Sequence, residues 1–136
     1  MAPPKPVELD LKQLQAASGA YPREAFEFVQ RGLSATAAQV HAAQLGGAGG
    51  GHVTGQQLCL GLAEMAIQQY GLMAQSVLEN WNIHRTDDFG KIVFAMIDAG
   101  MMRKTDEDSA EDFRDVFSFD DAFVDLPSKP NLPTSN

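Results

Sequence analysis

Residues 54–100 constrain the fold of this chain more than any other segment, because helix start and stop signals repeat along it. Thr54 and Gln57 match a capping box, in which a hydroxyl and an amide satisfy the free backbone groups of a helix start. Apolar residues then recur at helical spacing as far as Tyr70, where Gly71 marks a stop. The sequence therefore predicts a helix with defined ends in this part of the chain.

Two shorter helices are predicted after that one. The first carries an apolar repeat whose last large member is Trp81, and it ends at Asn82. The second begins at Thr86, because the acids at 87–88 favour the positive end of a helix dipole, and Gly100 ends it. The apolar stripes of these helices need one shared interior, so we expect Trp81 to be buried in it.

A longer helix is predicted upstream, and it begins at Tyr21-Pro22, where proline suits the first turn. It should end near Leu45, because the glycine-rich residues that follow lose too much backbone entropy as helix. Both ends of the chain are rich in proline and are predicted to be extended. The expected organisation is an extended tail with a short helix at 1–20, one helical domain at 21–126 with a Gly-rich linker at 46–51, and a proline-rich tail at 127–136.

The chain after Gly100 allows two interpretations. Residues 101–104 and 113–119 could be the two strands of a hairpin, and three helices before a hairpin are the order of a winged helix. Two hydroxyl–acid pairs at helix-cap spacing instead predict a helix or turn through the acids, followed by a short extended piece. We favour the second interpretation. The expected fold class is mainly α, a small bundle of about four to five helices, with one short β-hairpin near the C-terminus as the alternative.

Residues 105–125 combine the charge imbalance of the whole chain with half of its phenylalanines. The net charge is −8, and this segment holds nine acids against one base, so the remaining residues are neutral together. The rings are most simply core residues, because several aromatics left in water would be costly. Rings that point outward would instead form, with their neighbouring carboxylates, anchors for a basic partner. The candidate interaction residues are Phe113, Phe117, Phe119, Asp120, Asp121 and Phe123.

Several stretches of the chain resemble one known family. They are residues 52–58, 86–94, 99–109, 111–113 and 119–123, with a further match at residues 21–25. On these stretches the chain is similar to a family of uncharacterised small proteins restricted to planctomycete and verrucomicrobial bacteria. That family has no known activity, so the resemblance implies no reaction, ligand or partner.

The charge of the chain argues against nucleic acid as a partner, because Lys and Arg supply most non-specific binding to phosphates. A winged-helix-like DNA-binding regulator is the alternative function. It would have to contact DNA through the basic side chains that could cluster, which are Arg85, Lys91, Arg103 and Lys104. Such a protein would also have to fold its acidic segment well away from them.

No residue pattern specifies a reaction or a metal. The candidate soft ligands are His41, His52, Cys59 and His84, and no two of them have the i, i+4 spacing of a helical metal site. Whether they converge in space is open at this point. The serines lack a nucleophile elbow, and the acids at 106–112 lack the glycine and glutamate of a calcium loop. We expect no catalytic residue, no cofactor and no metal, with a metal-binding protein or enzyme as the third possibility.

The function expected from the sequence is a non-enzymatic interaction or adaptor module. Its acidic, phenylalanine-containing segment would engage a protein with a basic surface. The chain has no run of about eighteen apolar residues and no apolar signal region, so we expect a cytoplasmic protein without membrane contact. The sequence does not indicate an oligomeric state.

Overall fold

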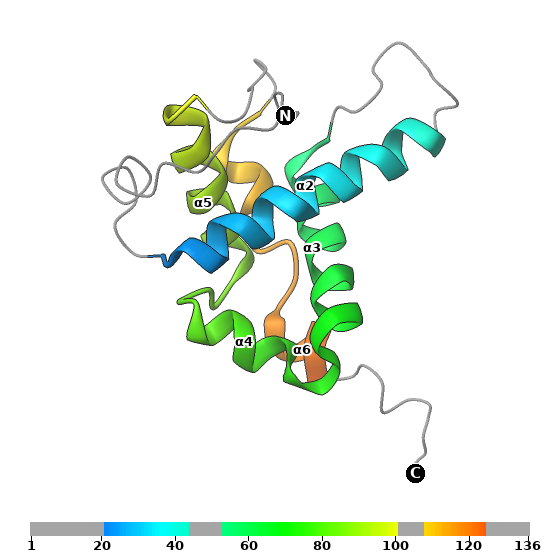
Figure 1. The fold of residues 1–136 in the computed structure, drawn as a ribbon, viewed down its shortest axis with the longest axis vertical. Coiled ribbons are helices and arrows are strands. Elements are labelled where there is room, and N and C mark those ends of the chain that lie inside the picture. Colours follow the sequence, from blue (N-terminus) through cyan, green and yellow to red (C-terminus); the bar gives the residue numbers. More distant parts are fainter. Residues whose placement is uncertain (1–20, 44–52, 101–107, 125–136) are drawn as a thin grey trace.

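The computed structural model describes residues 21–43, 53–100 and 108–124, and every regular element in those ranges is a helix (Figure 1). The α-helices are α2 (Arg23–Ala43), α3 (Gly55–Tyr70), α4 (Ala74–Asn80), α5 (Thr86–Asp98) and α6 (Phe119–Val124), and the 3-10 helices are η1 (Gly71–Met73) and η2 (Ala110–Phe113). The mainly α expectation is confirmed for this part of the chain. The short helix expected in residues 1–20, the linker at 46–51 and the tail at 127–136 lie outside the described residues.

Local start signals account for where the main helices begin. The Thr54 hydroxyl accepts a 3.1 Å hydrogen bond from the Gln57 amide, and the Gln57 side chain accepts a 2.9 Å bond from the Thr54 amide. The predicted capping box is therefore confirmed. At the start of α5, the Asp88 carboxylate accepts bonds from the backbone amides of His84 and Arg85, at 2.8 Å and 3.2 Å. These bonds satisfy amides that a helix end leaves without a partner.

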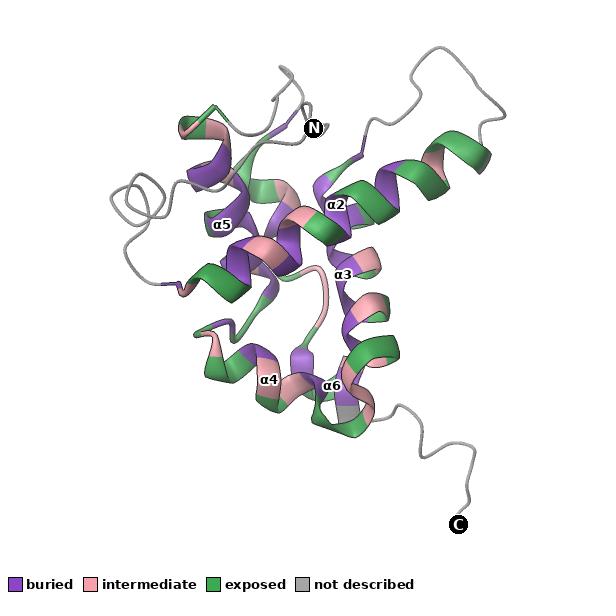
Figure 2. Ribbon diagram, viewed as in Figure 1, coloured by how far each residue is buried: buried purple, intermediate pink, exposed green. Residues whose placement is uncertain are grey.

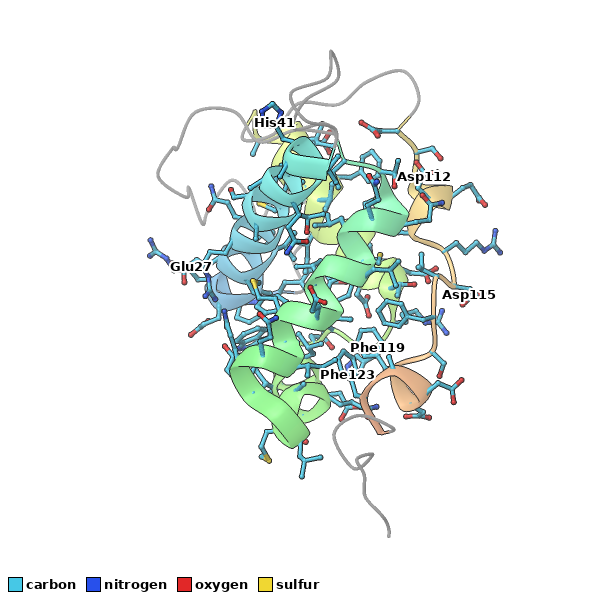
Figure 3. The ribbon with its side chains drawn as sticks, turned by 90° about the vertical axis from the view of Figure 1, so that its right-hand side faces the viewer. Glu27, His41, Asp112, Asp115, Phe119 and Phe123 are labelled. Atoms are coloured by element: carbon cyan, nitrogen blue, oxygen red, sulfur yellow. The ribbon has the colours of Figure 1, made fainter. Side chains whose placement is uncertain are left out.

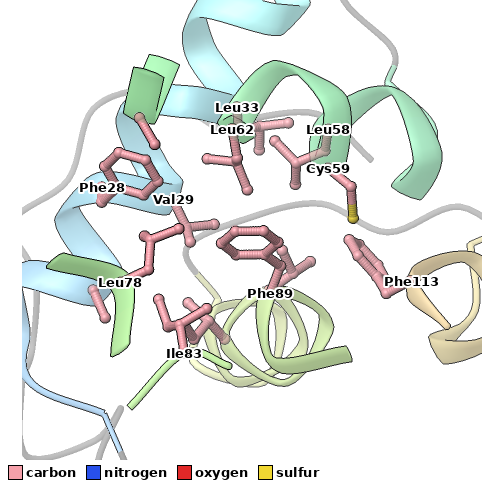
Figure 4. Close-up of a cluster of buried hydrophobic side chains, with 14 of the residues drawn as sticks. Phe28, Val29, Leu33, Leu58, Cys59, Leu62, Leu78, Ile83, Phe89 and Phe113 are labelled. Carbon is pink, nitrogen blue, oxygen red and sulfur yellow. The ribbon is translucent and has the colours of Figure 1, made fainter. Parts of the chain in front are cut away.

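The core lies where α2 crosses α3 and α5 (Figure 1). A Cβ atom at Gly32 would overlap the Leu62 side chain, and one at Gly61 would overlap Thr36, so glycine lets α2 and α3 approach closely. Phenylalanine and aliphatic side chains fill the space between these helices (Figure 4), and residues of α4, η2 and α6 also belong to the core. Figure 2 shows buried residues on the inward side of each helix, whereas the end of α2 after Ala37 is mostly exposed.

The prediction that Trp81 is buried is wrong in degree. Trp81 is only partly buried, and its ring packs on the buried Phe28 and on Tyr70, with centroids 5.5 Å and 6.1 Å apart. Trp81 follows the last residue of α4, at the edge of the core, and part of its side chain stays accessible to solvent. The shared interior is therefore closed on this side by aromatic side chains that reach the surface.

The structure contradicts the hairpin alternative where it describes the chain. Residues 113–119 do not form a returning strand, because η2 ends at Phe113, a turn follows with Asp115 at φ 46°, and α6 begins at Phe119. The 101–104 strand lies outside the described residues, which contain no strand. The Ser109 amide donates a 3.2 Å bond to the Asp112 carboxylate, so the cap signal favoured from the sequence produces a 3-10 helix here.

Candidate interaction surface

Residues 108–124, called the C-terminal strap below, close one side of the molecule. Its first part, η2, packs on α5 and α3, and its last part, α6, packs on α4 and α3 (Figure 1). One short segment thus contacts three earlier helices of the chain. The strap carries all six candidate interaction residues, so its two sides decide what these residues can do.

The inward side of the strap consists of phenylalanine rings. Phe113, Phe119 and Phe123 are only 1–4% exposed. The Phe113 ring lies 6.2 Å from that of Phe94, and the Phe119 ring lies 5.8 Å from that of Phe89. These three rings belong to the core, so the structure does not present them as exposed anchors. Burial of aromatic surface is what holds the strap in place.

Phe117 differs from the other three rings. It is partly buried, and it stacks on Phe119 at 5.9 Å and meets Phe123 edge to face at 6.5 Å. Its ring therefore rests on the buried pair while part of it remains accessible. Of the four candidate phenylalanines, Phe117 is the one with surface left for a partner.

Two glycines permit the strap to lie close to the helices beneath it. A Cβ atom at Gly90 of α5 would come within 2.9 Å of the Phe113 side chain, and one at Gly55 of α3 within 2.6 Å of the Asp112 side chain. Contacts this short do not occur with real side chains, so glycine is required at both positions unless the strap moves. Gly90 therefore has a packing role.

Hydrogen bonds from the start of α5 fix the strap's backbone. The buried Thr86 hydroxyl donates to the Phe113 carbonyl at 2.7 Å and accepts from the Val116 amide at 3.1 Å. The Asp87 carboxylate accepts a 3.3 Å bond from the Asp115 amide. Side chains of α5 thus hold the turn between η2 and α6. They form hydrogen bonds with backbone groups at the end of η2 and in the turn after it, which belongs to no helix or sheet.

The outward side of the strap is acidic. Glu111, Asp115, Asp120 and Asp121 are exposed, and Figure 3 shows Asp112 and Asp115 along the outer edge, with Phe119 and Phe123 turned to the inside. The one base of the strap, Arg114, pairs with Glu111 at 3.3 Å. Asp120 accepts a 2.9 Å bond from the Gln75 amide of α4. Within the described ranges, Asp115, Asp120 and Asp121 make no salt bridge with a lysine or arginine, so their charge faces solvent.

The candidate metal ligands do not form a site in the part of the chain that the structure describes. His41 and His84 are exposed, Cys59 is buried, and His52 lies outside the described residues. No group of three or more His, Cys, Asp or Glu residues comes together there to hold a metal ion. Burial, and secondarily the charge of Asp87, raises the pKa of the Cys59 thiol to about 12. Figure 4 shows its sulfur pointing toward Phe113, which is the surrounding of an inert core thiol.

The structure describes only two of the four basic residues through which the alternative DNA-binding regulator would contact DNA. Arg85 and Lys91 are exposed, and the Lys91 ammonium lies 4.0 Å from the Asp88 carboxylate, while Arg103 and Lys104 lie outside the described residues. The strap packs on α5, the helix that carries Lys91, and its exposed carboxylates add negative charge to this part of the molecule. This arrangement weakens the electrostatic case for DNA.

Sequence reasoning missed two exposed apolar features. Leu72 and Met73, in η1 between α3 and α4, are 73% and 61% exposed. Leu60 of α3 is 59% exposed, and with Val40 it lines a shallow groove of about 260 Å³ between α2 and α3. The available signal for the exposed pair was its position directly after Gly71, which ends α3. Residues beyond the end of a helix no longer follow the apolar face that the helix buries.

Comparison with known protein families, with curated proteins and with solved structures finds no match to this chain. The resemblance to the planctomycete and verrucomicrobial family therefore stays a prediction. Among the described helices, none has the length and apolar character needed to cross a membrane.

Proposed function

We propose that the protein is a non-enzymatic interaction module, which presents the exposed carboxylates of the C-terminal strap to a basic surface of a partner protein. The observation that supports this most is the division of the strap into two sides. Phe113, Phe119 and Phe123 hold it on the core, while Asp115, Asp120 and Asp121 are exposed and form no salt bridge with a lysine or arginine of the described residues. The strap is thus firmly placed and strongly charged.

Electrostatics gives this arrangement a consequence for binding. Like charges collected on one short segment repel each other, and a complementary surface relieves that repulsion and is attracted over about a Debye length, ~8–10 Å at ordinary salt. Such steering raises the association rate of a basic protein, whereas a phosphate backbone would be repelled. Phe117 adds accessible apolar surface among the acids. This combination favours a protein partner over nucleic acid.

Two matched variants test the proposal. The strap variant carries Asp115→Asn, Asp120→Asn and Asp121→Asn, and the matched variant carries Glu24→Gln, Glu64→Gln and Asp98→Asn. All six acids are exposed, and each triple substitution changes the net charge equally. Asparagine tolerates the positive φ of residue 115 and keeps an acceptor oxygen at residue 120, so the strap should stay folded.

Each full-length variant would be used as bait in an extract of the cells that make the protein, and bound proteins identified by mass spectrometry. The proposal predicts proteins that wild type and the matched variant retain and the strap variant loses. It is wrong if no retained protein depends on the strap acids, or if both variants lose the same proteins.

A further inference from the structure

An exposed apolar corner stands beside the strap, at the turn from α3 into α4. Leu72 and Met73, which we call the apolar corner, are 73% and 61% exposed. Gly71 shapes this turn with φ 55° and ψ −128°, a conformation that other residues rarely adopt. No atom lies near the position of a Cβ on Gly71, so glycine serves the backbone conformation there, and the exposed pair comes directly after it.

Partly buried apolar residues continue the corner along one side of α4. Met73, Val77 and Trp81 are spaced by four residues, which places them on one helix face, while Ala74 and Leu78 point into the core. Tyr70 adjoins this face, since its ring meets that of Trp81 edge to face. Contiguous apolar surface of this kind marks binding sites more often than single exposed side chains do.

Acids flank the other side of α4. The Gln75 amide, two residues beyond Met73, bonds to the Asp120 carboxylate at 2.9 Å and to the Glu79 carboxylate at 3.3 Å. Helices α4 and α6 are in contact, so the exposed acids of α6 stand close to the corner. An apolar surface with carboxylates on one border complements a partner whose own apolar surface is bordered by basic side chains.

We propose that the apolar corner and the α6 acids together bind one segment of a partner protein, an amphipathic helix whose apolar side chains are flanked by Lys or Arg. The apolar side chains of that helix cover Leu72 and Met73, and its bases face Asp120 and Asp121. Methionine suits such a surface, because its flexible thioether adapts to different apolar shapes. An anionic lipid surface is disfavoured by the same carboxylates. This inference rests on the proposed function, since it names the chemistry of the partner at the acidic surface.

The test uses fluorescence anisotropy with the full-length protein and a fluorescein-labelled amphipathic helical peptide of lysine and leucine, called the Lys/Leu peptide. Two control peptides replace its leucines by alanine or its lysines by glutamate. Leu72→Ser with Met73→Ser removes the corner. Leu60→Ser is the matched control, because Leu60 is similarly exposed but lies in the groove beside α2. Asp120→Asn with Asp121→Asn removes the charge.

The Lys/Leu peptide should bind more tightly than either control peptide. Removing the corner should weaken its binding about tenfold or more, since two apolar side chains lose their contacts, whereas Leu60→Ser should change binding less than about twofold. If the α6 charge variant weakens binding and the corner variant does not, this inference fails while the proposed function stands. If neither weakens it, both fail.

Two further results would overturn the inference. One is a loss of affinity from Leu60→Ser equal to that of the corner variant, which would show that binding does not depend on the apolar corner in particular. The other is corner-dependent sedimentation with vesicles of phosphatidylcholine and phosphatidylglycerol, which would assign the corner to a lipid surface. Thermal unfolding of each variant accompanies these measurements, and unchanged midpoints are expected because the altered side chains are exposed.

Discussion

The hydroxyl of Thr86, on α5, donates a hydrogen bond of 2.7 Å to the backbone carbonyl of Phe113, on the C-terminal strap. The same oxygen accepts a bond from the Val116 amide, and Thr86 is fully buried. Thr86→Val keeps the side-chain shape but leaves both backbone groups without this partner. We expect it to lower the free energy of unfolding by about 1–3 kcal/mol, measured by urea denaturation. Thr86→Ser keeps the hydroxyl and should lose clearly less; equal losses would show that the methyl group, and not the hydroxyl, matters.

Because Gly90 lies against Phe113, we expect Gly90→Ala to lower the stability of the fold, opposite to the usual effect of this substitution in a helix. Glycine to alanine inside a helix ordinarily raises stability by about 0.5–1 kcal/mol. At Gly90 the new methyl group would come within 2.9 Å of the Phe113 side chain, so we expect a loss of about 1–3 kcal/mol instead. Thermal and urea unfolding of Gly90→Ala would measure it, and a gain in stability would contradict the described packing.

Different consequences are expected from truncating two neighbouring rings of the strap. Phe119 is 4% exposed and contacts Phe89, so Phe119→Ala should cost about 3–5 kcal/mol of stability. Phe117 is only partly buried, so Phe117→Ala should cost less and should act mainly on partner binding. Denaturation curves for the two variants compare them directly. A larger loss of stability from Phe117→Ala than from Phe119→Ala would mean that Phe117, and not Phe119, is the buried ring.

The buried pair of Tyr21 and Asp88 predicts a pH dependence. Burial, together with the hydrogen bond to Asp88 and the charge of that carboxylate, raises the pKa of Tyr21 above its ordinary value of 10.0. A raised folded-state pKa contributes stability that is complete below the unfolded pKa and is lost as pH rises toward the folded value. Wild type should therefore be more stable than Tyr21→Phe by about 1–3 kcal/mol through neutral pH, with the difference shrinking above about pH 10. Urea denaturation across this range measures it, and a difference that grows with pH would contradict the assignment.

Local signals made the helices predictable, and tertiary contacts made the strap hard to predict. The cap at Thr54 and the stops at Gly71 and Gly100 depend on nearby residues alone, so the sequence located α3 and α5 closely. The path of the strap depends instead on Thr86 and Gly90, which belong to a helix many residues earlier. Alternation of phenylalanines there resembled a strand, although the rings enter the core from a 3-10 helix, a turn and α6.

The site was predictable in composition but not in orientation. The same segment was identified from its acids and rings, and the structure separates them, with Asp120 and Asp121 outward and Phe119 and Phe123 inward. Ser118, with acids at positions 120 and 121 in the first helical turn, was the available start signal for α6. The exposed Leu72 lies directly after Gly71, whose backbone conformation the sequence alone does not specify.

The association rate of the Lys/Leu peptide, measured by stopped flow as salt rises from about 0.05 to about 0.5 M, tests the central claim most directly. The strap acids should steer the encounter, so the wild-type rate should fall about tenfold or more across this range, and the matched variant should follow it. The strap variant should associate slowly at low salt and respond little to added salt. If the strap and matched variants lose rate and salt dependence equally, net charge alone explains the attraction, and the claim that the strap is a binding surface is contradicted.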